Sequence, residues 1–428
     1  MNSTAWTAVA IFLAAYVLIV SERVHRTIVA LFGAVLVILC GILTQEQAIT
    51  HIDFNTIGLL VGMMIMVTIT SETGVFNFLS IWAAKKAKGN PVALLIILTL
   101  LTAVCSAFLD NVTMILLTIP ITFSITSKLK VPVKPYLISQ IMASNIGGTA
   151  TLIGDPPNVM IGSAVKELDF LAFITNLSDI CAVILVITLG ILLLIYRKDL
   201  HTTEELKQQI MRIDEHRLIK RPVLLQKCLI SLALTVILFV LHGFLNLSTG
   251  TVALAGASLL MLMTLSKMGR FLTKVFSKVE WTAIFFFIGL FILVGSLVET
   301  GVIKLLAEKA MEMTHGDVTT TSMTILGLSA IMSAFVDNIP FVATMIPLIK
   351  DMGEMGLSNL EPMWWALSLG ACLGGNGTIV GASANVVAIS IASARGFRIS
   401  FGKFMVIAFP LMLLSIGISA IYLYVRHL

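Results

Sequence analysis

The chain repeats itself: shifted by 227 residues, it aligns with itself without a gap. Between residues 53–162 and 280–389, 27 of 110 aligned residues are identical. The shared segments include Glu72-Thr-Gly-Val75 with Glu299-Thr-Gly-Val302, Ala107-Phe-Leu-Asp-Asn111 with Ala334-Phe-Val-Asp-Asn338, Pro120 with Pro347, and Gly154 with Gly381. Compositional bias does not place Asp, Asn, Pro and Gly together in register. The sequence therefore predicts two halves with the same fold.

Long apolar runs fill both halves, so the chain needs a bilayer as its solvent. Of its 428 residues, 58% are hydrophobic and only 12% are charged, whereas soluble domains carry about 25% charged residues. The mean hydropathy is +1.01. The predicted spans lie at about 5–20, 27–43, 54–70, 136–165, 172–196, 228–243, 250–266, 280–298, 363–394 and 404–424. This composition excludes a soluble enzyme.

Other classes of protein are excluded by the charge and by the cysteine and histidine patterns. The net charge of +5 is small and fits an excess of Lys and Arg in cytosolic loops, so no nucleic-acid partner is expected. The five cysteines lie inside apolar runs without a CxxC pair, and the seven histidines form no HExxH motif. We expect neither a metal centre, a cofactor nor an enzymatic activity.

Two apolar regions, 91–127 and 318–350, are each interrupted halfway by Asp-Asn. Lysines occupy both flanks of the first region: Lys85, Lys86, Lys88, Lys128, Lys130 and Lys134. Both flanks are therefore expected on the cytosolic side, which predicts a re-entrant helical hairpin rather than one span. Acidic residues follow the second region, namely Asp351, Glu354 and Glu361, so its hairpin is expected to enter from outside.

Basic loops orient the remaining spans. The segment 197–227 holds eight Lys or Arg, and 267–278 carries Lys267, Arg270, Lys274 and Lys278 without an acid, so both are predicted to be cytosolic. Run 5–20, which Arg23, His25 and Arg26 follow, is expected to be a retained first helix rather than a signal peptide. Ten spans with two opposed hairpins then place both termini outside.

In this topology the span at 54–70 runs opposite to its mate at 280–298, so the halves are inverted repeats. The predicted division is repeat 1 at 1–200, a cytosolic linker at 201–227 and repeat 2 at 228–428. Inverted repeats are typical of secondary transporters, in which a central site faces each side in turn. A passive channel is the alternative from another class.

Asp110 and Asp337 lie in the middle of the two hairpins, one in each repeat. An unpaired carboxylate at the bilayer centre costs about 2.5–3.5 kcal/mol, and no Lys or Arg is near either residue in sequence. Such a group must face a polar cavity, bind a cation or be protonated. The adjacent Asn111 and Asn338 are predicted to cap the second hairpin helices. The alternative is that each Asp-Asn pair only forms a tight turn.

Glycine-rich breaks interrupt two predicted spans, 136–165 and 363–394. They read NIGGTATLIGDPPN at 145–158 and CLGGNGTIVGASAN at 372–385. A broken helix exposes carbonyl groups at one stub and N–H groups at the other, and these bind ions where they line a cavity. Close helix packing by small residues is the alternative. Asp155 has no acidic mate in the repeat and is either a third titratable group or part of the turn.

These motifs resemble the ion transporter superfamily, most closely the branch of arsenite efflux permeases, sodium/proton antiporters and the melanosomal P protein. The resemblance rests on Asp110-Asn-Val-Thr113, residues 147–158, Val336-Asp-Asn-Ile-Pro340 and residues 375–387, and it covers nearly the whole chain. Divalent anion/sodium symporters carry Ser-Asn-Thr at their hairpin tips, where this chain has Asp110 and Asp337. The added negative charge argues against dicarboxylate transport unless bound cations offset it.

The resemblance implies scaffold and transport parts, a homodimer in the cell membrane, and an elevator movement. The expected activity is proton-coupled efflux of a small inorganic solute such as arsenite or antimonite; a Na⁺/H⁺ antiporter and a Na⁺-coupled carboxylate or chloride carrier are the alternatives. The predicted ligands are Asp110, Asn111, Thr113, Thr149, Thr151, Asn158, Asp337, Asn338, Asn376, Thr378 and Asn385. Asp110, Asp155 and Asp337 are candidate proton sites, and Asp110, Asn111, Asp337 and Asn338 are candidate Na⁺ ligands.

Overall fold

The computed structural model describes residues 2–21, 23–264 and 269–428, which form helices joined by short loops. No strand occurs within these ranges. Nine helices in this part of the chain are long and apolar enough to cross a bilayer. The protein is therefore an all-α polytopic membrane protein, as the sequence predicts. Lys267 and the end of the predicted span 250–266 lie outside the described residues.

The first half contains ten helices. They are α1 (Ser3–Val20), α2 (Arg26–Leu39), α3 (Gln45–Thr50), α4 (Phe54–Ser71), α5 (Val75–Lys86), α6 (Pro91–Phe108), α7 (Asn111–Leu129), α8 (Lys134–Thr149), α9 (Pro156–Ala164) and α10 (Phe170–Tyr196). The connection to the second half holds α11 (Glu204–Met211) and a short 3-10 turn at Glu215–Leu218.

The second half contains a matching series. Its helices are α12 (Pro222–Leu245), α13 (Thr249–Met263), α14 (Gly269–Phe276), α15 (Trp281–Glu299), α16 (Val302–Met313), α17 (Val318–Phe335), α18 (Asn338–Glu354), α19 (Glu361–Gly374), α20 (Ser383–Ala394) and α21 (Phe401–Arg426). Adding 227 to the bounds of α6 gives 318 and 335, which are the bounds of α17. These two helices are therefore separated by the same 227 residues as the repeated sequence segments.

Local sequence explains where the hairpin helices begin. Asn90 caps α6 by accepting hydrogen bonds from the backbone N–H groups of Val92 and Ala93, at 2.9 and 3.2 Å. Pro91 occupies the first helical position, where the N–H that proline lacks would have no partner within the helix. Asp317 caps α17 in the same way through Thr320. Each hairpin is thus entered through a side-chain cap.

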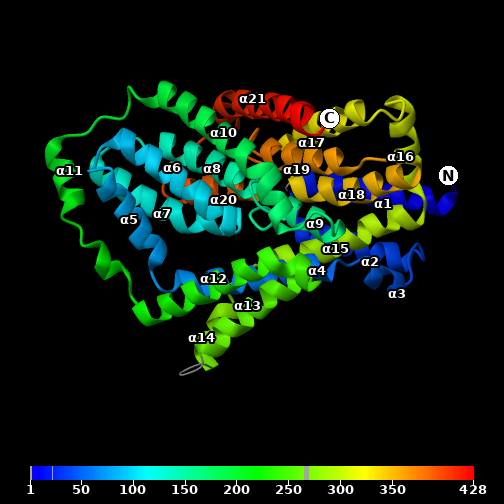
Figure 1. Ribbon diagram of the computed structural model, residues 1–428, viewed down its shortest axis with the longest axis horizontal. Helices are drawn as coiled ribbons and strands as arrows, with labels where there is room; N and C mark the ends of the chain where they lie inside the picture. Colours follow the sequence, from blue (N-terminus) through cyan, green and yellow to red (C-terminus); the bar gives the residue numbers. More distant parts are fainter. Residues whose placement is uncertain (1, 22, 265–268) are drawn as a thin grey trace.

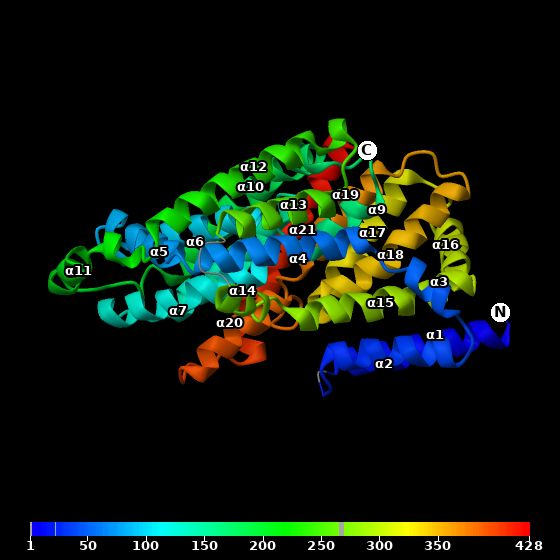
Figure 2. The ribbon, with the colours of Figure 1, turned by 90° about the horizontal axis from the view of Figure 1, so that it is seen from below.

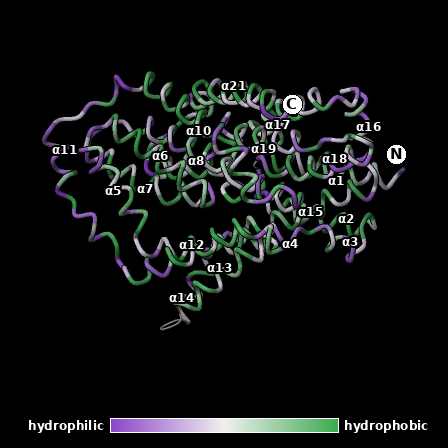
Figure 3. The backbone as a smooth tube through the Cα atoms, viewed as in Figure 1, coloured by the Kyte–Doolittle hydropathy of each residue, from purple (hydrophilic) through white to green (hydrophobic). Residues whose placement is uncertain are grey.

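The two helical hairpins occupy opposite ends of the molecule. Helices α6 and α7 lie at the end that also carries α5 and α11, whereas α17 and α18 lie at the end with α16 and the N-terminus (Figures 1 and 2). Hydrophobic residues line most helices, and hydrophilic residues gather along the connection around α11 (Figure 3). The assignment of these ends to cytosol and exterior stays a prediction, as does the division at 1–200, 201–227 and 228–428.

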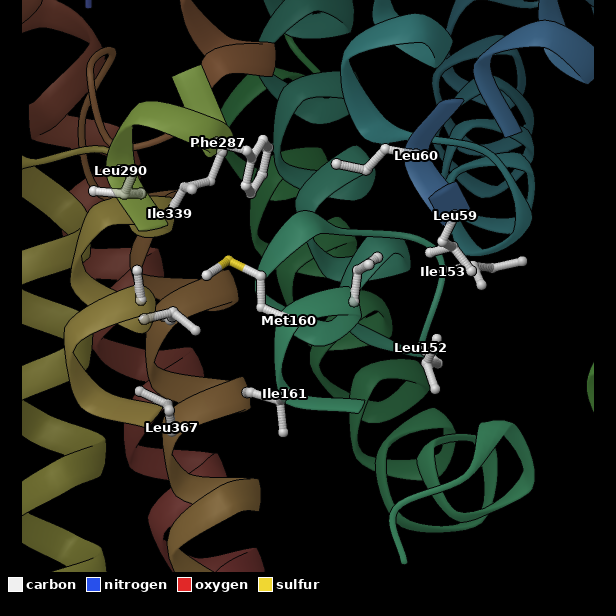
Figure 4. Packing of buried hydrophobic residues seen from close by; sticks show 14 of the residues in the cluster. Leu59, Leu60, Leu152, Ile153, Met160, Ile161, Phe287, Leu290, Ile339 and Leu367 are labelled. Carbon is white, nitrogen blue, oxygen red and sulfur yellow. The ribbon is translucent and has the colours of Figure 1, made fainter. Parts of the chain in front are cut away.

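At the centre, helices of the first half pack against helices of the second half. Helix α4 packs along α13, and α2 packs along α15. The short helix α9 packs against α4, α18 and α19. Its Met160 lies near Leu60 of α4, Phe287 of α15 and Ile339 of α18 (Figure 4). Within a bilayer such contacts stabilise by close packing rather than by removal from water. This packing fixes the residues that follow the first helix break.

Candidate functional site

Each hairpin tip is a short extended turn followed directly by a helix. Leu109 is extended, with φ −127° and ψ 147°, and α7 begins at Asn111. Asp110 accepts hydrogen bonds from the backbone N–H and the hydroxyl of Thr113, both at 3.0 Å. Asp337 accepts from the backbone N–H of Ile339 at 3.3 Å. The predicted caps Asn111 and Asn338 are therefore wrong: each aspartate caps the helix, and each asparagine is its first residue.

The two helix breaks are closed by asparagine side chains. Asn158 donates through Nδ2 to the carbonyl oxygens of Thr149 and Thr151, both at 2.9 Å. Its repeat mate Asn385 donates to the carbonyl oxygens of Gly375 and Thr378, at 2.7 and 2.9 Å. These amides satisfy carbonyl groups that the interrupted helix leaves without partners. Both asparagines are buried inside their breaks.

Hairpin and broken helix are joined tightly in each half. The hydroxyl of Thr151 donates to the carbonyl oxygen of Ala107, and that of Thr378 donates to the carbonyl oxygen of Ala334. A Cβ atom at Gly147 would lie 2.1 Å from the carbonyl oxygen of Ala103, so α6 and α8 cross too closely for a side chain there. Each hairpin and its broken helix therefore form one rigid unit.

A buried asparagine connects the two breaks to each other. Asn145 donates through Nδ2 to the side-chain oxygens of Asn376 and Asn385, at 2.9 and 3.0 Å. Its own side-chain oxygen lies 3.4 Å from Nδ2 of Asn111. Asn145 is not among the ligands predicted from the sequence, because its repeat mate is Cys372 and the internal repeat gives no signal there.

A small polar cavity lies where the hairpin tips meet the start of α9. We call it the acidic chamber; it is lined by Arg26, Leu60, Met64, Asp110, Asn111, Val112, Asp155, Pro156, Glu280, Ala283, Phe287, Asn338, Ile339, Ala382 and Ser383. Its volume is about 30 Å³, which is room for one or two water-sized groups. The two acidic turns, far apart in sequence, therefore come together in space.

Apart from Asp337, which lines a separate pocket described below, the predicted ligands and proton sites fall into two groups. Asp110, Asn111, Asp155 and Asn338 line the acidic chamber. The side chains behind it bond to other parts of the protein: Thr113, Thr149, Thr151, Asn158, Asn376, Thr378 and Asn385. The predicted residues that face the chamber are thus mainly those of the hairpin tips, while the broken helices bond to the rest of the protein.

Three carboxylates line the chamber: Asp110, Asp155 and Glu280. Asp155 is only 1% exposed, and within the described chain its Oδ2 atom has no hydrogen-bond partner. Among the described residues no three His, Cys, Asp or Glu side chains converge on a single metal position. The chamber therefore gathers three acidic side chains in one small cavity. Glu280 was missed from the sequence, because it is the first residue of the predicted span 280–298 rather than an acid inside an apolar run.

Asp337 is paired with a base from the first helices. Arg26, the first residue of α2, donates to Asp337 and also to the hydroxyl of Ser383, the latter at 2.7 Å. Ser383 in turn donates to Asp337 at 2.9 Å. The guanidinium lies over the Phe286 ring, 5.0 Å from its centroid. This ion pair spans 311 residues, so no local pattern in the sequence could reveal it.

A larger pocket lies on the other side of this ion pair. Its volume is about 290 Å³, and its lining includes His25, Arg26, Phe335, Asp337 and Ser383. Arg26 and Ser383 line both this outer pocket and the acidic chamber. The ion pair therefore stands at the boundary between the two spaces.

Residues 16–370 match the sequence profile of the family described as CitMHS, citrate transporter. The chain belongs to the citrate transporter family. A 41% identical relative, an uncharacterized transporter of Mycobacterium tuberculosis, is covered over 98% of both chains. The human P protein is 34% identical over 98% of this chain, which spans 60% of that protein's length. The predicted likeness to the P protein is thus confirmed, and membership identifies a membrane transporter rather than an enzyme.

The crystal structure of the Alcanivorax borkumensis YdaH transporter has a similar fold. The TM-score is 0.59 at 14% sequence identity, over 99% of this chain and 98% of that one. At this identity the likeness concerns the fold alone. This citrate transporter family member therefore shares the architecture of a known membrane transporter, and its site must be argued from its own residues.

Proposed function

We propose that this citrate transporter family member is a secondary active transporter of the cell membrane, coupled to a proton or a sodium ion. The observation that carries the proposal is the acidic chamber. Asp110 and Asp155 lie at the meeting point of two hairpins, in a cavity that has space for a small cation. Carboxylates placed within a membrane protein are costly and are typical of proton and ion pathways.

The carried solute that best fits this chamber is small and uncharged or cationic. A free carboxylate anion would meet three acidic side chains there, and Arg26, the one basic residue lining the chamber, already binds Asp337. A neutral hydroxide such as arsenite or antimonite can instead hydrogen-bond to Asn111 and Asn338. Efflux of such a solute in exchange for protons is our first candidate, and Na⁺/H⁺ antiport is the second.

A carboxylate carrier is a further candidate, and the family's description favours it. An anion could first bind in the outer pocket, where Arg26 is 30% exposed, but to pass through the chamber it would need bound cations that offset the chamber's charge. The acidic chamber alone does not attract it. This candidate therefore predicts strict dependence on a co-bound cation.

The rigid units described above support an elevator movement. Each hairpin is bonded to its broken helix, so α6–α9 and α17–α20 would move as bodies against α2, α4, α13 and α15. A homodimer would anchor the remaining helices within the lipid. Because two inverted halves share one chamber, the same carboxylates would face each side of the membrane in turn.

Transport into everted vesicles tests this proposal. Arsenite, Na⁺ and citrate are offered separately, without a gradient, with a pH gradient or with a Na⁺ gradient, to vesicles that contain wild type or Asp110→Asn. The proposal expects saturable uptake of one solute that collapses with the gradient and is lost in Asp110→Asn. Flux that does not saturate and ignores both pH and Na⁺ gradients would identify a passive channel. Citrate uptake without any cation requirement would contradict the charge argument.

A further inference from the structure

The two repeat-related aspartates have different electrostatic surroundings. Asp337 contacts Arg26, the first residue of α2, whereas the matching helix α13 begins with Thr249. The match follows from packing, because Gly62 of α4 approaches Ala253 of α13 as its mate Gly289 of α15 approaches Ala30 of α2. The position that matches Arg26 therefore supplies no base to Asp110. The repeat thus matches the two hairpin aspartates, Asp110 and Asp337, but not the base at Arg26.

The surroundings of Asp110 are acidic instead. Asp155 and Glu280 line the chamber with it, and the repeat mate of Asp155 is Ala382. The mate of Glu280 is Asp53, which is occupied as the cap of α4, accepting from the N–H groups of Asn55 and Thr56. Among the described lining residues, the chamber thus holds two further acids beside Asp110, and the outer pocket holds none beside Asp337.

One oxygen in this cluster is open to a ligand. Oδ2 of Asp155 is buried and has no hydrogen-bond partner within the described chain, although it belongs to a residue that lines the chamber. A buried carboxylate oxygen without a donor is rare in a stable structure. A cation or proton in the chamber would supply the missing interaction.

We propose that Arg26 is a tethered cation that fills the ion position at Asp337, so that each chain loads its coupling cation only on the Asp110 side of the chamber. This inference rests on the proposed cation coupling and adds its location and number. Ser383 fixes the tethered cation, because it bonds to both Arg26 and Asp337. The pair also separates the chamber from the outer pocket, so a cation entering from there must pass it.

Counting bound cations on purified protein in detergent tests the proposal. One measurement counts the ²²Na⁺ ions bound at equilibrium at about pH 8. The other counts the protons taken up when the pH is lowered from about 8 to about 5, a range in which carboxyl groups begin to be protonated. Arg26→Gln is expected to bind one cation more than wild type, as Na⁺ or as a proton, because the position at Asp337 is vacated. The gain should disappear in Arg26→Gln/Asp337→Asn. Equal counts for wild type and Arg26→Gln would overturn the proposal.

The double variant also serves if Arg26→Gln alone does not fold, because it removes both charges together. It should bind as many cations as wild type; a count lower by one would show that Asp337 holds a cation in wild type and would refute the proposal. Arg26→Lys, which keeps the charge, and Arg23→Gln, an exposed neighbour, should both match wild type. Asp110→Asn tests the proposed function separately: if it binds as many cations as wild type, cation loading at Asp110 is wrong.

Discussion

Replacing Asn145 with alanine should weaken the junction between the two broken helices. The substitution removes the two hydrogen bonds that join the halves, to Asn376 and Asn385 at 2.9 and 3.0 Å, and also a longer one from Asn111 at 3.4 Å. Hydrogen bonds between helices in membranes average about 0.6 kcal/mol and reach about 1.7 kcal/mol. Two such bonds predict a loss of about 1–3 kcal/mol in the free energy of unfolding.

The measurement is reversible unfolding in lipid bicelles by steric trapping, with Ser139→Ala as the matched control. Ser139 is also buried in α8, but its hydroxyl donates only within its own helix, to the carbonyl oxygen of Tyr136 at 3.0 Å. The control should therefore lose much less stability than Asn145→Ala. Equal losses in the two variants would refute the idea that Asn145 joins the halves.

Two further predictions concern packing and pH. Gly147→Ala should lose about 1–3 kcal/mol of stability, because its Cβ would overlap a backbone oxygen of α6, while Gly190→Ala, with open space around it, should be neutral or slightly stabilising in the same unfolding assay. Burial raises the pKa of Glu72, but hydrogen bonds from Lys278 and Lys274 outweigh it and lower the pKa from 4.5 to about 2. Because the pKa of Glu72 is lower in the folded protein than in the unfolded chain, its ionised carboxylate stabilises the fold above pH 4.5. This stabilisation is lost as the pH falls towards 2. The melting temperatures of wild type and Glu72→Gln should therefore converge over that range; a constant difference would contradict it.

The sequence was sufficient to predict the all-α membrane fold and the positions of most helices. Hairpins expected at 91–127 and 318–350 appear as helix pairs at 91–108 with 111–129 and at 318–335 with 338–354. Apolar runs, flanking prolines and capping residues are local signals, so they can be read without knowing the fold.

The electrostatic partners could not be predicted, because they depend on contacts between distant segments. Arg26 follows a first helix and looks like an ordinary cytosolic flanking charge, yet it binds Asp337. Glu280 precedes α15 and becomes a chamber residue only when α7 is placed beside it. The prediction that Asn111 rather than Asp110 caps α7 was also wrong. Both residue types cap helices, and only the backbone angles decide at which residue the helix begins.

Charge movement on a solid-supported membrane would test the chamber most directly, without requiring a known solute. Proteoliposomes that contain wild type or Asp110→Asn are exposed to a rapid jump in pH or in Na⁺ concentration. The wild-type protein should give a transient current as the cation enters the chamber, and Asp110→Asn should give none. A transient of undiminished size in Asp110→Asn would contradict the assignment of the acidic chamber as the cation site.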